Sequence, residues 1–180
     1  EKFFAVKESI GLKNATLYLN VSAHTIMHPE FCSIFTDFVT KHSLEPNQFG
    51  LEVTETAELA DIQIASDSLN ALKKQGIKIA LDDFGAGYAS LRYIQDLPID
   101  VVKLDKHFTF NIKDPVTSRL IGFVTEVCKD LNLEMIGEGV ETEEERQAML
   151  DLGCKIGQGY LMHRPAFLES FTRSTEEHDG

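Results

Sequence analysis

Short apolar runs alternate with longer amphipathic segments along the whole chain. Each run is about as long as a β-strand, and several carry Ile, Val and Leu at consecutive positions, which is typical of parallel strands covered on both faces. The six runs are Leu17–Val21, Phe49–Thr54, Ile77–Leu81, Val101–Leu104, Leu133–Ile136 and, more weakly, Lys155–Tyr160. This alternation predicts repeated βα units around one parallel sheet, which is either open or closed.

The segments between the runs carry the signals of helices. The predicted helix Glu58–Gln75 has an apolar stripe made of Leu59, Ile62, Ala65, Leu69 and Leu72. A second helix is expected to begin at Asp114-Pro115, where a capping residue precedes a proline at the first helical position. Its expected buried side chains are Leu120, Val124, Val127 and Leu131. A third helix begins with a capping box formed by Thr142 and Glu145.

Length and composition are those of an ordinary globular domain. The chain has 180 residues, of which 43% are hydrophobic and 26% are charged, enough for one substantial core. No apolar run approaches the ~20 residues that span a bilayer, and the first residues lack the layout of a signal peptide. We therefore expect a cytoplasmic domain whose own residues make no membrane contact, although upstream domains could anchor the parent protein.

Charge and cysteine usage exclude two classes of function. The net charge of −12 argues against a protein that binds a nucleic-acid polymer through its phosphates. Cys32, Cys128 and Cys154 lie far apart, and no CxxC or Cys/His spacing joins them, so neither a disulfide framework nor a zinc site is expected. We expect three buried thiols.

Polar and charged residues lie at the carboxyl end of every predicted strand. They are Asn20, Glu52 with Glu55, Asp82 with Asp83, Lys103 with Asp105, Glu138 with Glu141, and Gln158. Burying unpaired charge is costly, so chance should rarely place such residues at the end of every core strand. In a parallel barrel these ends meet on one face, where active sites form. The pattern predicts a convergent acidic site with a single lysine.

The possible metal ligands of this site are hard oxygen atoms, and the site contains neither histidine nor cysteine. They favour Mg²⁺ or Mn²⁺, with Ca²⁺ as an inhibitory competitor. Carboxylates that share a small volume need cations between them, and two such metals form a clamp for displacement at phosphorus. Each residue alone also allows a plainer interpretation. Asn20 is a turn or cap residue, Glu52 and Glu55 are a solvated edge, Asp82-Asp83 is a tight turn, and Lys103 is a surface residue.

Six motifs in order resemble the EAL domain family. They are Leu19-Asn20-Val21-Ser22, Leu51-Glu52-Val53-Thr54-Glu55, Asp82-Asp83-Phe84-Gly85-Ala86-Gly87-Tyr88, Val102-Lys103-Leu104-Asp105, Glu138-Gly139-Val140-Glu141 and Gln158-Gly159-Tyr160, the last followed by Arg164-Pro165. The resemblance covers about residues 17–165. It implies a TIM-like (β/α)8 barrel of EAL type that binds cyclic-di-GMP and hydrolyses it to linear pGpG with Mg²⁺ or Mn²⁺ in a two-metal site.

The resemblance also implies roles for individual residues. The implied metal ligands are Asn20, Glu52, Asp82, Asp83 and Glu138. Lys103 would act on the attacking water, together with Glu52, Asp82 and Asp83 as catalytic residues. Gln158, Glu141 and Asp105 would bind substrate. Glu55, Phe84 and Gly85 would anchor the loop that couples metal binding to a homodimer.

Two features depart from the family pattern. Ala86 stands where threonine is usual, and the printed sequence contains no E-A-L segment. Six strands are also fewer than the eight of a closed barrel. We therefore expect residues 1–168 to be a partial EAL domain of about six βα units, with impaired hydrolysis and an open edge that favours dimerisation. Residues 169–180 are expected to be a mobile tail.

Two other functions compete with the phosphodiesterase. One is a non-catalytic receptor for cyclic-di-GMP or a protein-interaction module, which tight nucleotide binding without product would support. The other is a different metal-dependent barrel, such as an enolase-like or Schiff-base lysine enzyme. It fits Lys103 alone and leaves the remaining motifs unexplained.

Overall fold

Six parallel strands form a single sheet in the computed structural model, which describes residues 15–54, 61–86 and 90–167. The strands are β1 (Leu17–Asn20), β2 (Phe49–Thr54), β3 (Lys78–Phe84), β4 (Val101–Leu104), β5 (Glu134–Glu138) and β6 (Ile156–Gln158). They lie side by side in sequence order, and every neighbouring pair is parallel. The predicted α/β class and the six strands are confirmed.

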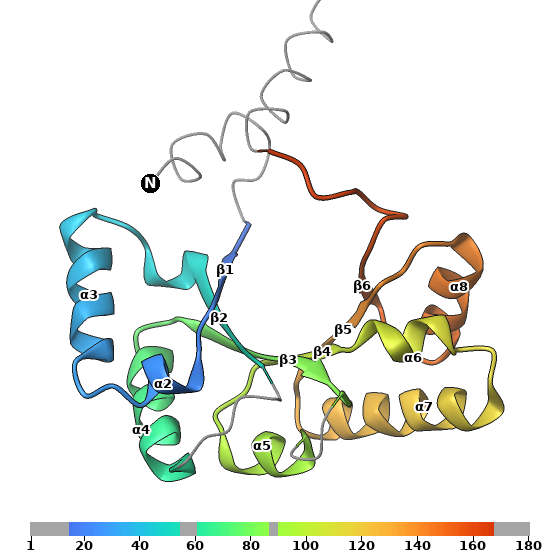
Figure 1. Cartoon of the computed structure of the whole chain (residues 1–180), viewed down its shortest axis with the longest axis horizontal. Coiled ribbons are helices and arrows are strands. Elements are labelled where there is room, and N and C mark those ends of the chain that lie inside the picture. The colour runs from blue at the N-terminus through green and yellow to red at the C-terminus, as the bar shows by residue number, and fades with distance from the viewer. Residues whose placement is uncertain (1–14, 55–60, 87–89, 168–180) are drawn as a thin grey trace, which may run out of the picture.

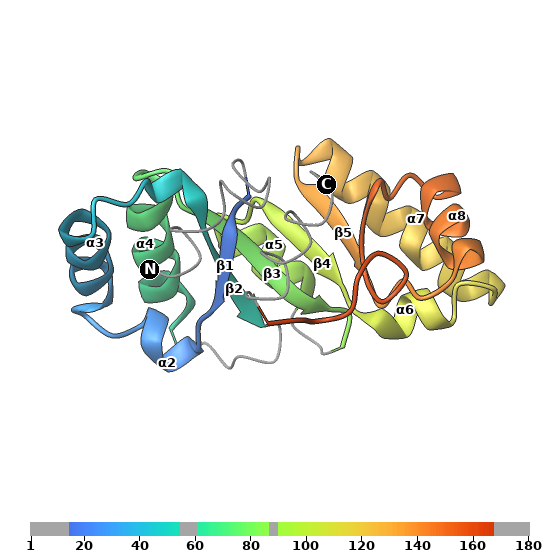
Figure 2. The same ribbon diagram turned by 90° about the horizontal axis from the view of Figure 1, so that it is seen from above.

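Helices cover the convex face of this curved sheet, as Figure 1 shows, so the described part of the chain is a half-barrel. They are α2 (Ala23–Ile26), α3 (Phe31–Lys41), α4 (Ile62–Lys73), α5 (Ser90–Asp96), α6 (Lys106–Phe110), α7 (Pro115–Asp130) and α8 (Glu143–Asp151), with a 3-10 turn at Pro46–Gln48. The view in Figure 2 shows the concave side of the sheet. No helix in these described ranges is long and apolar enough to cross a membrane.

The core lies between the sheet and the helices. Alternate strand residues point outward, and those of the central strands are fully buried, including Leu51, Ile79 and Leu104. They share one apolar cluster with Ala65, Leu69 and Leu72 of α4, so the predicted stripe of this helix is confirmed except at Leu59, which lies outside the described residues. The inward-facing strand positions are left for the polar side chains of the site.

Several local expectations need correction. The helix α7 buries Ile121, Val124 and Cys128, whereas Leu120 and Leu131 are 48% and 54% exposed. The buried face is therefore turned by about one residue from the predicted stripe. All three cysteines are free thiols, and Cys128 and Cys154 are buried, but Cys32 is only partly buried. The capping box at the start of α8 is present as predicted.

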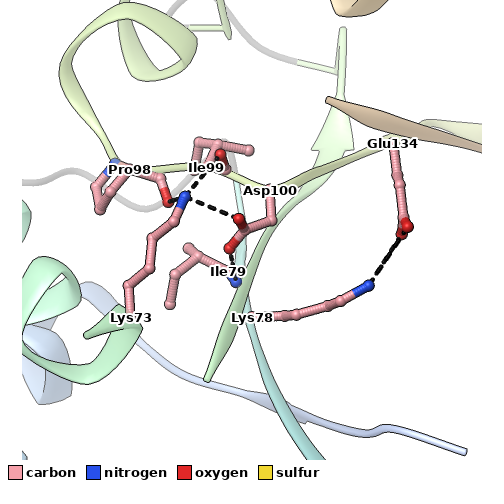
Figure 3. A network of polar contacts seen from close by, with 7 residues as sticks. All are labelled: Lys73, Lys78, Ile79, Pro98, Ile99, Asp100 and Glu134. Carbon is pink, nitrogen blue, oxygen red and sulfur yellow. Dashed lines mark hydrogen bonds and ion pairs between the residues drawn. The ribbon is translucent and has the colours of Figure 1, made fainter. Parts of the chain in front are cut away.

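A polar clamp fastens the amino ends of β3 and β4 (Figure 3). The Asp100 carboxylate accepts a hydrogen bond from the backbone N–H of Ile79 at 2.9 Å and pairs with Lys73 Nζ at 2.8 Å. Lys73 also donates to the carbonyl oxygens of Pro98 and Ile99. This end of the sheet lies opposite the acidic residues, and its charged groups hold α4 to the loop before β4.

Removing the clamp should destabilise the fold. We expect Asp100→Ala to lower the free energy of unfolding by about 1–3 kcal/mol, because the N–H of the buried Ile79 loses its side-chain acceptor. Urea unfolding followed by circular dichroism measures this loss. Asp96→Ala is the matched control, since the Asp96 side chain pairs with exposed Arg92, and its effect should be near zero. Equal effects of the two substitutions would contradict the prediction.

Candidate active site

Strand register brings the predicted site residues to one face of the sheet. Asn20 pairs with Glu52 across β1 and β2, and Glu138 pairs with Gln158 across β5 and β6. Residues that pair across parallel strands point to the same face, as do residues two apart along one strand. Glu52 pairs with Ala80, which places Asp82 on the same face. The carboxyl ends of the strands thus gather their polar side chains on the concave side.

A β-bulge gathers two consecutive aspartates. Leu81 pairs with Val102 and Phe84 with Leu104, so Asp82 and Asp83 together lie opposite the single residue Lys103. Asp83 adopts a left-handed backbone with φ of 55°. In a regular strand the two side chains would point to opposite faces. Here Asp82, Asp83 and Glu138 each offer an oxygen, and these three oxygens lie within 4.8 Å of one another. Both residues belong to β3, and a tight turn begins at Asp83, where the Ala86 N–H donates to the Asp83 carbonyl oxygen at 3.0 Å, so the turn is present but is not the whole role of the pair.

Lys103 lies at the centre of the acidic cluster. Its Nζ is 2.9 Å from Glu52 Oε1, 2.7 Å from Asp82 Oδ1 and 2.8 Å from Glu138 Oε1. Its side chain is 7% exposed, which rules out the alternative of a surface lysine. With Asp83, which lies close to Asp82 and Glu138, the cluster has four carboxylates and one ammonium group, so it carries three uncompensated negative charges when all are ionised.

The pKa values reflect this excess of negative charge. Burial raises the pKa of Glu138, against the opposing effect of Lys103. Burial also raises the pKa of Asp83, and the neighbouring Asp82 and Asp105 raise it further. Burial alone would lower the pKa of Lys103, but hydrogen bonds to Asp82, Glu138 and Glu52 outweigh it, and the net pKa lies above the ordinary value of 10.5. Lys103 is therefore an ammonium ion at neutral pH, and the cluster favours added positive charge.

The cluster fits a hard divalent cation. The buried Asp82 Oδ1 is paired with Lys103 Nζ at 2.7 Å and receives no other hydrogen bond within the described part of the chain. An oxygen of this kind, close to two further carboxylates, suits a hard divalent cation better than a softer metal. Asn20 ends β1 beside Glu52 and is exposed, so its side chain is accessible at the rim of the same cluster.

A pocket of about 260 Å³ adjoins the cluster at the ends of β5 and β6. Glu138, Glu141 and Gln158 line it, together with Lys106, Phe110 and Tyr160. Two of the residues predicted to bind substrate are therefore brought next to a predicted metal ligand. The backbone N–H of Glu141 also donates to Glu145 at the capping box, so this residue leads directly into the start of α8.

The remaining predicted residues lie around the cluster. Asp105 caps α6, where its Oδ1 accepts a hydrogen bond from the N–H of His107 at 2.8 Å. Phe84 is buried at the end of β3, and Gly85 has a φ of 95° with Phe108 packed against it. Glu55 lies outside the described residues. The short helix α6, and with it the buried Thr109, was absent from the sequence prediction, because five residues are too few for a periodic pattern.

The family model described as EAL domain matches residues 4–165. The chain belongs to the EAL domain family. Solved EAL domains superpose closely on it, so the predicted TIM-like EAL fold is confirmed, with six strands in the described part.

Among relatives of this EAL domain, the bifunctional diguanylate cyclase/cyclic di-GMP phosphodiesterase MucR of Pseudomonas aeruginosa is 34% identical over 165 residues, which are 91% of this chain and 24% of MucR. The solved MucR phosphodiesterase in complex with c-di-GMP matches with a TM-score of 0.83 and 32% identity, over 93% of this chain and 68% of that one.

The solved BlrP1 of Klebsiella pneumoniae, in a complex with manganese and cyclic-di-GMP, matches this EAL domain with a TM-score of 0.81 and 31% identity. That match covers 91% of this chain and 42% of BlrP1. The chain spans about a quarter of the length of the curated relatives it matches.

Proposed function

We propose that this EAL domain is a metal-dependent phosphodiesterase that hydrolyses one phosphodiester bond of cyclic-di-GMP and yields linear pGpG. The observation that carries the proposal is the convergence of three carboxylates on the buried ammonium of Lys103 at the carboxyl ends of the strands, with the Asp83 carboxylate beside two of them. Relatives named as cyclic-di-GMP phosphodiesterases support the substrate. A solved relative in complex with that nucleotide supports it too.

The proposed metal ligands are Asn20, Glu52, Asp82, Asp83 and Glu138. When bound, a pair of Mg²⁺ or Mn²⁺ ions would acidify the attacking water and neutralise charge on the phosphate oxygens. The excess of negative charge in the cluster supports this assignment, as does the hard character of its donors. Ca²⁺ binds oxygen sites with longer and more flexible coordination, and we expect it to compete without supporting hydrolysis.

Lys103 is proposed to hold the attacking water or a phosphate oxygen through its charge. Its raised pKa keeps it protonated, so it donates hydrogen bonds and does not act as a general base. Gln158 and Glu141 offer amide and carboxylate groups to the nucleotide in the adjoining pocket. Asp105 remains a predicted substrate contact, and its cap on α6 fixes the chain directly after Lys103.

Product analysis tests the proposal directly. The intact protein, incubated with cyclic-di-GMP and either Mg²⁺ or Mn²⁺, should form pGpG, separable by anion-exchange chromatography. Addition of EDTA should stop the reaction, and Ca²⁺ should suppress it. Tight nucleotide binding by calorimetry without any pGpG would instead support the alternative of a non-catalytic receptor.

Three further expectations accompany the proposal. The homodimer, with Glu55, Phe84 and Gly85 at the coupling loop, stays a prediction, and so do the cytoplasmic location and the domain limits at residues 168 and 169. In the described part of the chain, the outer strands β1 and β6 do not pair with each other.

A further inference from the structure

The helix α6 lies between the strand ends that carry the acidic cluster. It follows Lys103 after two residues, and its N-cap is Asp105. On one side, Phe108 packs so closely on Gly85 that a Cβ at this glycine would overlap the aromatic ring. On the other side, a Cβ at Gly139 would overlap Lys106. The helix thus touches the residues directly after the ends of both β3 and β5, so it sets the spacing between them.

One hydrogen bond ties α6 to the last residue of β5. The hydroxyl of Thr109 donates to the backbone carbonyl oxygen of Glu138 at 2.5 Å, and Thr109 is fully buried. A threonine in a helix often bonds a carbonyl of its own preceding turn, but this hydroxyl bonds across to another element. The next residue, Gly139, has a φ of 69°. The bond therefore fixes the backbone at the point where the chain turns away from the strand.

We propose that Thr109 is a positioning residue for the acidic cluster. By holding the Glu138 carbonyl, its hydroxyl keeps the Glu138 carboxylate 2.8 Å from Lys103 Nζ and close to Asp82 and Asp83. The effect on metal binding rests on the proposed function, whereas the effect on the Glu138–Lys103 contact does not. Groups that orient metal ligands through hydrogen bonds commonly change metal affinity by about 10- to 100-fold when they are removed.

Packing alone is the competing explanation, because a buried threonine also fills space. Valine has nearly the same shape and lacks the hydroxyl, so Thr109→Val separates the two roles. Thr109→Ser keeps the hydroxyl and loses a methyl group, so it should retain the positioning function. Thr125→Val is the matched control, since the Thr125 hydroxyl also donates to a backbone carbonyl, that of Ile121 at 2.9 Å, within α7.

Calorimetric titration of the intact protein with Mn²⁺ provides the first measurement. We expect Thr109→Val to bind Mn²⁺ about 10- to 100-fold more weakly than the unmodified protein. Thr109→Ser and Thr125→Val should both bind nearly as tightly as the unmodified protein. Unchanged affinity in Thr109→Val would overturn the inference, and so would an equal loss in Thr125→Val or a failure of serine to restore binding.

A metal-free crystal structure of the Thr109→Val variant provides the second measurement. The Glu138 carboxylate should move away from Lys103 Nζ, and a retained ion pair would overturn the inference. If the unmodified protein bound no Mn²⁺ at all, the proposed function would fail, and the crystal structure would still decide whether Thr109 positions Glu138.

Discussion

Replacement of Lys103 by methionine is expected to lower the free energy of unfolding by about 3–5 kcal/mol at neutral pH, the usual effect of leaving buried charges without their partner. The ammonium of Lys103 is the common partner of Glu52, Asp82 and Glu138. Methionine fills much of the same volume but leaves these carboxylates facing one another. Urea unfolding of the metal-free protein, followed by circular dichroism, measures the loss.

The loss of stability caused by Lys103→Met should depend on pH. Burial already raises the pKa of Glu138 above its ordinary value of 4.5, and loss of the lysine should raise it further. A carboxyl group with a raised pKa binds a proton on folding, so stability falls as pH rises through the window between the unfolded and folded values. The titration of Lys103 itself does not change stability in this range. Its folded pKa lies above the ordinary value of 10.5, so the stability linked to its own proton is lost only as pH rises above that value. The variant should therefore approach the unmodified protein in stability as pH falls toward 4.5.

Lys74→Met is the control for this experiment, because Lys74 is an exposed residue at the end of α4. Its effect should be small at every pH. Divalent cations should also recover part of the stability of Lys103→Met, since they neutralise the same carboxylates. Equal stability of Lys103→Met and the unmodified protein at neutral pH would show that the ion pairs do not hold the cluster together.

Asp82→Asn is expected to weaken Mn²⁺ binding by more than about 100-fold, beyond the effect of losing a group that only orients a ligand. Asp82 supplies a buried oxygen that is paired with Lys103, beside Asp83 and Glu138. The substitution conserves size and removes one negative charge from a cluster with an excess of them, so the metal-free fold should not lose stability. Calorimetric titration with Mn²⁺ measures the affinity, and pGpG formation should fall at least as far.

The control for Asp82→Asn is Asp67→Asn on the exposed surface of α4, where Asp67 accepts a hydrogen bond from Gln63. It removes the same charge at a distance from the cluster and should leave Mn²⁺ affinity unchanged. Mn²⁺ binding by Asp82→Asn as tight as that of the unmodified protein would remove Asp82 from the proposed ligand set.

The sequence predicted the strands well because each combines a strand-length apolar run with a polar end. It placed the end of the third strand at Leu81, whereas β3 runs to Phe84. Two adjacent aspartates before a glycine look like a turn, and only the pairing with β4 reveals the bulge that keeps them in the sheet. Non-local pairing of this kind leaves no mark in a local pattern.

Helix faces and the inner contacts of the site were harder to predict. On α7, a stripe through Leu120 and a stripe through Ile121 are both apolar, and neighbouring elements decide which one is buried. Lys103 was expected to hold water or phosphate, but its direct ion pairs with three carboxylates depend on the closeness of strands that are far apart in sequence. The Thr109 hydrogen bond depends on the same kind of closeness.

An internal counter-ion such as Lys103 has a consequence for how the protein responds to chelation. In many small zinc domains the ligands come together only when the ion arrives, so metal removal unfolds the chain. Here the ammonium group holds the oxygen donors in place beforehand. Divalent ions should therefore leave and return to a site that is already formed. Their removal should switch activity off reversibly, and the fold should stay intact.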